Sequence, residues 1–178
     1  MKLSFKLITK ILVIFFILFT LQANALQIGD KAPNFKADTT LGELDFYDWS
    51  QGQWVILLSH PGDFTPVCTT ELAEAAKLQP LLKKKNAKIL TLSADSVKDH
   101  LEWVEVINNY KNKTTTTDDL KNLLLGIEGD TDVNFPIISD PDLEVAILYG
   151  MYHPKALPNA SSLGGENKST IRAVFIIC

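Results

Sequence analysis

The sequence predicts an α/β domain in which helices cover a central, mostly parallel sheet. Strand-like runs at 54–58 and 88–93 are each followed by a longer segment of helical periodicity, at 65–85 and 96–110. The first run, Trp-Val-Ile-Leu-Leu, is almost continuously apolar, which is typical of a strand buried on both faces. Strands that alternate with helices favour a parallel core sheet covered on both sides.

The remaining elements are expected before and after this core. Segments 34–40 and 43–46, separated by Leu41-Gly42, predict an N-terminal β-hairpin, and a short helical turn is expected near 47–51. After the second helix, patterning indicates a strand, a helix and a strand at 137–138, 143–149 and 171–177. The threonine-rich and then leucine-rich stretch at 112–132 is interpreted as a surface insertion.

Residues 1–25 have the pattern of a cleavable secretory leader. Three lysines precede the apolar run 11–21, and Ala23-Asn24-Ala25 supplies an Ala-x-Ala cleavage pattern. The run is short for a membrane span, which needs about twenty apolar residues, so an uncleaved anchor is the weaker interpretation. Cleavage removes 25 of the 178 residues and leaves 26–178, enough for a single domain. We expect an exported protein, periplasmic in a bacterium and in the secretory pathway or secreted in a eukaryote.

Charge and motif content exclude several classes of function. Three of the 17 basic residues lie in the leader, so cleavage leaves 14 basic against 21 acidic residues, a net charge of −7. The only basic cluster, Lys83–Lys85, fits a solvated helix end better than a phosphate or lipid patch. No Cys/His spacing suggests a metal and no glycine-rich loop suggests a nucleotide. We expect no cofactor, no metal, no nucleic-acid partner and, after cleavage, no membrane association.

Cys68 is the strongest candidate for a functional residue. Thr65 can serve as the N-cap of the following helix and Pro66 suits its first position, so Cys68 falls in the first turn. Unpaired N–H groups there stabilise a thiolate over a thiol. The alternative is that Cys68 is a small buried hydrophobe, as most free cysteines are. Its place after a Pro-Gly-Asp turn and before Thr69-Thr70 favours the reactive interpretation.

Arg172 is the only arginine in the chain. It precedes Ala173-Val174-Phe175, at the predicted start of a buried strand, where a charge needs a partner. A guanidinium stays cationic at any working pH and presents rigidly arranged donors, which suits stabilisation of an anion. The alternative is an ordinary surface charge at the end of a strand.

The segment from Pro61 to Glu71, Pro-Gly-Asp-Phe-Thr-Pro-Val-Cys-Thr-Thr-Glu, resembles the active-site signature of the peroxiredoxins, thiol peroxidases with a thioredoxin-like fold. Threonine after the cysteine resembles the one-cysteine branch of this family, the peroxiredoxin six type. The likeness extends to segments 30–35, 92–103, 135–140 and 172–177. The resemblance implies a thioredoxin-like fold for the predicted α/β domain.

The resemblance also implies roles for individual residues. Cys68 would attack the terminal oxygen of hydrogen peroxide or an organic hydroperoxide and become a sulfenic acid. Thr65 would bind the peroxide through its hydroxyl, and Pro66 would shield the sulfur. Arg172 would stabilise both thiolate and peroxide, and Glu71 would orient that arginine.

His60 matches a family histidine near the thiol and is a weaker candidate. Cys178 does not occupy the position of a resolving cysteine and is interpreted as structural or incidental. Reduction of the sulfenic acid therefore requires an external thiol, such as glutathione, a thioredoxin-like protein or a small thiol. Related enzymes are commonly dimers, so we expect a homodimer active in antioxidant defence and redox homeostasis.

The chain stops where family members continue into a further strand and a C-terminal region, so the predicted domain at 26–178 lacks that region. This leaves a second hypothesis, a catalytically impaired peroxiredoxin acting as a chaperone-like or interaction protein. A thioredoxin-type disulfide reductase fits the fold but requires Cys-x-x-Cys, which the sequence lacks.

Overall fold

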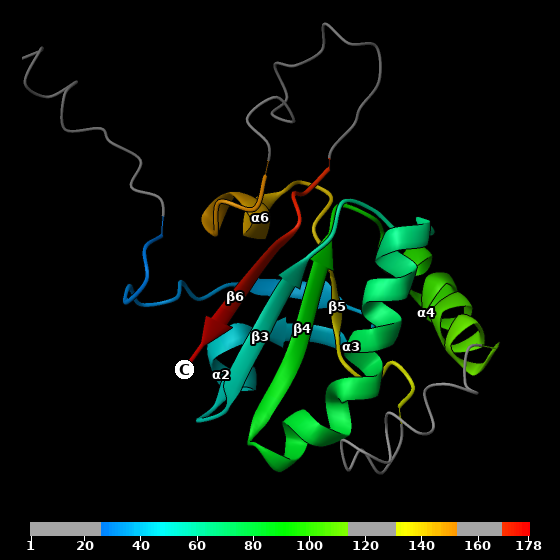
Figure 1. Ribbon diagram of the computed structural model, residues 1–178. Coiled ribbons are helices and arrows are strands. Elements are labelled where there is room, and N and C mark those ends of the chain that lie inside the picture. Colours follow the sequence, from blue (N-terminus) through cyan, green and yellow to red (C-terminus); the bar gives the residue numbers. More distant parts are fainter. Residues whose placement is uncertain (1–25, 114–130, 153–168) are drawn as a thin grey trace, which may run out of the picture. The chain divides into compact units, whose positions relative to one another are not determined.

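The computed structural model describes residues 26–113, 131–152 and 169–178 (Figure 1). The predicted leader at 1–25 and most of the expected insertion at 112–132 lie outside the described residues. The chain groups into two units, Met1–Asp30 and Lys31–Cys178, and the larger unit contains all the helices and strands given below. Within the described residues, no helix combines the length and apolar character needed to cross a bilayer.

Six strands form one mixed sheet in the order β2-β1-β5-β4-β3-β6. Their bounds are β1 Lys36–Thr39, β2 Gly42–Asp45, β3 Trp54–Ser59, β4 Ala87–Ser93, β5 Ile137–Ser139 and β6 Ala173–Ile177. The central strands β5, β4 and β3 are parallel to one another, whereas β1 and β6 join this centre antiparallel. The N-terminal hairpin is confirmed by the antiparallel pair β1 and β2. The sheet is therefore parallel only at its centre.

The described helices lie where helical patterning predicts them. Their bounds are α2 Phe46–Ser50, α3 Pro66–Lys84, α4 Val97–Lys113 and α6 Glu144–Leu148. Helices α3 and α4 lie side by side, α3 against β4 and α4 against β5 (Figure 1). The α/β prediction is confirmed, and the order of strands and helices is that of the thioredoxin-like fold implied by the resemblance.

The main hydrophobic core lies between α3, α4 and the sheet. Trp103 of α4 is completely buried there and donates from Nε1 to Thr69 Oγ1 at 3.0 Å. The buried residues of this core are Cys68, Leu72, Ala73, Ala76, Ile89, Trp103, Ile107, Val133, Phe135 and Ile137. On β6, Phe175 contacts Tyr149 edge to face, while its neighbours in sequence project to the opposite side of the sheet.

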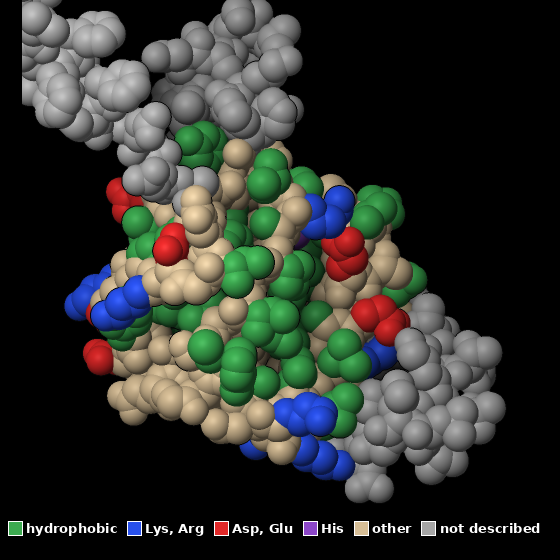
Figure 2. Space-filling view, turned by 60° about the vertical axis from the view of Figure 1, so that its left-hand side comes forward, with side chains coloured by type: hydrophobic (Ala, Val, Ile, Leu, Met, Phe, Trp, Pro, Cys, Tyr) green, Lys and Arg blue, Asp and Glu red, His purple; other side chains and the backbone are tan. Residues whose placement is uncertain are grey.

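Strand β6 differs from its prediction as a buried strand. Its outward side chains Val174 and Ile176 are 60% and 71% exposed, and β6 pairs only with β3 within the described residues. Between β6 and α3 lies a groove of 520 Å³, lined mainly by apolar residues of β3, α3 and β6. Figure 2 shows hydrophobic side chains gathered into a continuous patch on this side of the molecule. The edge and the groove together form the uncovered β6 face.

Candidate active site

Helix α3 begins as the sequence predicts, with one difference in its cap. Thr65 is the N-cap residue with extended backbone, and Pro66 occupies the first helical position. The Thr65 hydroxyl does not accept from the N–H groups of the first turn; it donates to the carbonyl oxygen of Gly62 at 3.2 Å. The side chain of Thr65 therefore leaves these N–H groups free to act on an anion.

Cys68 is 1% exposed and belongs to the apolar core. The burial that the sequence left as the alternative for Cys68 is therefore what the structure shows. Cys68, Leu72 and Ala76 are spaced four residues apart, so all three lie on the buried side of α3. The Cys68 sulfur is buried but still within reach of polar groups, since it lies where the apolar side of α3 meets the start of the helix.

The single arginine contacts this buried sulfur. Arg172 Nη2 donates to Cys68 Sγ at 3.2 Å, and Arg172 Nε donates to Glu71 Oε2 at 2.8 Å. The bond to Cys68, followed by that to Glu71, raises the pKa of Arg172 above its usual value. A charge-assisted hydrogen bond of this kind stabilises negative charge on the atom that accepts it. The structure thus brings together three residues that the sequence singled out from two distant segments.

Ser59, the last residue of β3, fixes the backbone on both sides of Arg172. Its hydroxyl donates to the carbonyl oxygen of Ile171 at 2.6 Å and accepts from the N–H of Ala173 at 3.1 Å. Thr170 Oγ1 also donates to the carbonyl oxygen of His60. The segment that carries the guanidinium is therefore anchored to the end of β3, beside the first turn of α3.

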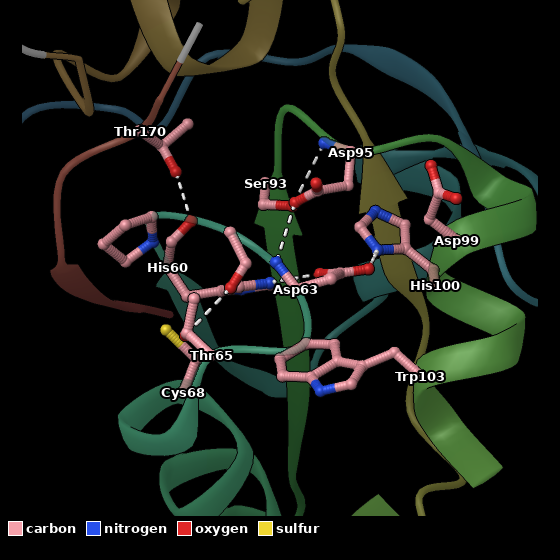
Figure 3. A network of polar contacts seen from close by, with 12 residues as sticks. His60, Asp63, Thr65, Cys68, Ser93, Asp95, Asp99, His100, Trp103 and Thr170 are labelled. Atoms are coloured by element: carbon pink, nitrogen blue, oxygen red, sulfur yellow. Dashed lines mark hydrogen bonds and ion pairs between the residues drawn. The ribbon is translucent and has the colours of Figure 1, made fainter. Parts of the chain in front are cut away.

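His60 is buried and lines the same groove as Glu71 and Arg172. Its Nε2 lies 3.0 Å from Asp63 Oδ1, and the other carboxylate oxygen lies 2.6 Å from His100 Nδ1 (Figure 3). Burial raises the pKa of Asp63, but the hydrogen bonds from His100 and His60 outweigh it and hold that pKa below its usual value. Sequence reasoning missed Ser59, Asp63 and His100. Asp63 stands inside the signature segment, which was the one signal available.

Potential metal ligands also meet in this region. One atom from each of His60, Asp63 and Asp95 lies within 4.8 Å of the others. Asp95 Oδ2 already accepts from the N–H of Asp63 at 3.0 Å and from Ser93 Oγ at 2.6 Å, and His60 is bonded to Asp63. These hydrogen bonds account for the clustering of the three side chains.

Comparison with known proteins shows which family this chain belongs to. The model of the AhpC/TSA family matches residues 28–178. The chain belongs to this family. It is 44% identical over 154 residues to a 1-Cys peroxiredoxin of Dictyostelium discoideum, an alignment that covers 86% of this chain and 53% of that protein. It is 50% identical over 129 residues to human Peroxiredoxin-6, covering 72% of this chain and 51% of that protein.

A solved structure shares the fold of this AhpC/TSA family member. The yeast mitochondrial 1-Cys peroxiredoxin, solved for its thiol resolving mechanism via glutathione/thioredoxin systems, matches with a TM-score of 0.66 and 37% identity over 85% of this chain and 62% of that one. The resemblance to one-cysteine peroxiredoxins is thereby confirmed. The chain spans little more than half the length of the curated relatives it matches.

The lowered pKa of Asp63 predicts a specific loss of stability in acid. A carboxylate whose pKa is depressed by folding stabilises the protein above its unfolded pKa of about 3.9, and this contribution disappears as pH falls through the lower folded value. Asp63→Asn keeps similar hydrogen-bonding capacity without the charge. We expect wild type to be more stable than Asp63→Asn by about 1–3 kcal/mol at pH 6.

We expect this difference to shrink below about pH 4, since Asp63 then binds a proton in the unfolded chain, whereas the folded protein binds it only at a lower pH. Urea unfolding of both proteins between pH 6 and pH 3 measures the difference. A difference that stays constant across this range would show that the charge of Asp63 does not stabilise the fold.

Proposed function

We propose that this chain is a thiol-dependent peroxidase that reduces hydrogen peroxide and organic hydroperoxides. The observation that supports this most directly is the hydrogen bond from Arg172 Nη2 to Cys68 Sγ at the first turn of α3. A cation and a helix start acting on one sulfur favour a nucleophilic thiolate. Membership of the AhpC/TSA family and likeness to one-cysteine peroxiredoxins support the same reaction.

In the proposed reaction, the thiolate of Cys68 attacks the terminal peroxide oxygen. An S–O bond forms as the O–O bond breaks. The terminal oxygen stays on the sulfur, which is oxidised to a sulfenic acid, and the other oxygen leaves as an alkoxide or hydroxide that takes a proton from solvent. In-line attack requires the two oxygens to be aligned with the sulfur. The Arg172 guanidinium stabilises negative charge as it moves from sulfur to oxygen.

The neighbouring residues have supporting roles in this proposal. Thr65 binds the peroxide through its hydroxyl, which exchanges its bond to Gly62 for one to substrate. Pro66 shields the sulfur from solvent at the start of α3. Glu71 orients the guanidinium through its 2.8 Å bond to Nε. His60 lines the groove beside Glu71 and Arg172.

We propose that an external thiol restores Cys68. Two thiols reduce the sulfenic acid to the free cysteine, forming one disulfide and one water. Cys68 is buried and Cys178 is exposed, and both are free cysteines. The yeast relative, whose thiol is resolved via glutathione/thioredoxin systems, supports a reductant of that type. We also propose the dimeric state typical of this family.

The uncovered β6 face favours a second candidate, a chaperone-like or interaction protein. Val174 and Ile176 expose an apolar surface of the kind that contacts other proteins. The family membership and the Cys68–Arg172 contact support the peroxidase more strongly, and the following experiment separates the two.

Replacing the nucleophile tests the peroxidase. Cys68→Ser is expected to abolish peroxide consumption in the presence of a small thiol, because a hydroxyl at this position is not ionised at neutral pH. Peroxide treatment of wild type is expected to add one oxygen atom at Cys68 by intact mass and peptide mapping. Cys178→Ser, the matched control, should behave as wild type. Persistence of peroxide turnover in Cys68→Ser would contradict the proposal, and protection of client proteins that survives this variant would favour the second candidate.

Removing the guanidinium tests its role at the sulfur. Arg172→Ala is expected to slow the reaction of Cys68 with peroxide by about 10²–10³-fold, because it removes a donor aimed at developing charge. Stopped-flow measurement of the second-order rate constant checks this. Lys98→Ala, which removes an exposed cation on α4, should leave the rate unchanged. An Arg172→Ala rate equal to wild type would exclude the guanidinium from the reaction.

Finally, we propose that residues 1–25 are a cleaved leader that directs the protein out of the cytosol. The lysines, apolar run and Ala-x-Ala pattern support export. N-terminal sequencing of protein expressed in its native host is expected to begin at Leu26, and Ala25→Arg is expected to block this processing. Recovery of the wild-type protein with Met1 intact and in the cytosol would refute the proposal.

A further inference from the structure

Three buried polar residues form a continuous chain beside Cys68. His60 follows β3, Asp63 lies in the loop before α3, and His100 belongs to α4; their exposures are 2%, 9% and 0%. The carboxylate of Asp63 bridges the two imidazoles, and His100 Nε2 continues the chain to the carbonyl oxygen of Ile138 at 3.0 Å. Figure 3 shows Asp63 between the two histidines, with Thr65 and Cys68 on the side away from His100.

The partners of His100 determine where its protons are. A carbonyl oxygen only accepts, so Nε2 of His100, bonded to Ile138, carries a hydrogen. Nδ1 of His100 lies 2.6 Å from Asp63 Oδ2, which is hydrogen-bond distance. His100 therefore links the Asp63 carboxylate to the backbone of β5 through two buried hydrogen bonds.

The same carboxylate determines the tautomer of His60. Its oxygen Oδ1 accepts from His60 Nε2, so the hydrogen of a neutral His60 is on Nε2. Nδ1 of His60 then carries a lone pair, and it has no hydrogen-bond partner among the described residues. The ring packs against Trp103, with centroids 5.0 Å apart. Asp63 thus holds His60 with one defined orientation.

Asp63 also fixes the loop that leads into α3. Its N–H donates to Asp95 Oδ2 at 3.0 Å, and Ser93 Oγ donates to the same oxygen at 2.6 Å. The next residue, Phe64, has a left-handed backbone with φ of 55°. This conformation is unfavourable for a residue other than glycine and persists only when its surroundings impose it. Thr65 follows directly, so the anchors on Asp63 set the start of α3.

We propose that Asp63, supported by His100, is a positioning residue for the reaction of Cys68 with peroxide. Its hydrogen bonds hold the loop from Pro61 to Thr65 in the shape that presents the Thr65 hydroxyl and the first turn of α3, and they orient His60. This inference rests on the proposed peroxidase function. Asp63 acts through these neighbours and does not contact the reacting atoms itself.

The test separates alignment of peroxide from formation of the thiolate. Iodoacetamide also reacts with the thiolate but does not require alignment of a peroxide, so the ratio of the peroxide to the iodoacetamide rate constant reports alignment. We expect Asp63→Ala to lower this ratio by about 10–100-fold, since a misplacement of about 1 Å costs up to about 10² in rate. Asp63→Asn, which keeps an acceptor for His60 and a donor for a neutral His100, is expected to restore it to within about fivefold of wild type.

Two further variants complete the experiment. His100→Phe removes the support behind Asp63 and is expected to lower the ratio by about tenfold; it provides the test if Asp63→Ala does not fold. Ile107→Val, which trims the buried core two turns further along α4, is the matched control for destabilisation and should leave the ratio at the wild-type value.

The outcomes distinguish this inference from the proposed function. A wild-type protein whose Cys68 does not react with peroxide would overturn the peroxidase. If wild type reacts and Asp63→Ala or His100→Phe keeps the wild-type ratio, the positioning role is wrong. An equal fall of the ratio in Ile107→Val would assign the effect to general destabilisation and would also overturn the positioning role.

Discussion

One contact organises the described structure around Cys68: a guanidinium donates to a sulfur 104 residues earlier in the chain. Neither residue by itself would indicate a reactive site. An almost fully buried cysteine without a cation would be an ordinary core residue, and an arginine at the end of an edge strand would be an ordinary surface charge. Their meeting places a cation beside the sulfur at the boundary of the core.

The sheet explains why this meeting occurs where it does. β3 and β4 are parallel, so their C-terminal residues lie at the same end of the sheet, and the loop into α3 starts from that end. β6 runs antiparallel to β3, with Ala173 opposite Ser59, so β6 begins at this same end of the sheet. Ligand sites of open α/β sheets commonly lie at the carboxyl ends of the strands. Here, the hydroxyl of Ser59 joins the two segments.

Local patterns predicted much of this arrangement, and long-range packing decided the rest. The hairpin, the central strands and the start of α3 at Thr65 and Pro66 follow from turn residues, apolar runs and capping chemistry. The polar residues around Cys68 do not indicate its burial, whereas its four-residue spacing to Leu72 does. The chain of Asp63 and His100 joins residues 37 positions apart, and no sequence periodicity encodes such a bond.

The register of β6 against β3 has a consequence for how the folded protein is recognised. Side chains alternate between the two faces of a strand, so a slip of β6 by one residue would turn the guanidinium to the other side of the sheet. Helix content and compactness would hardly change. Circular dichroism or gel filtration would therefore not distinguish misaligned molecules from native ones. The reactivity of the Cys68 sulfur, in contrast, would show whether β6 had paired with β3 in the correct register.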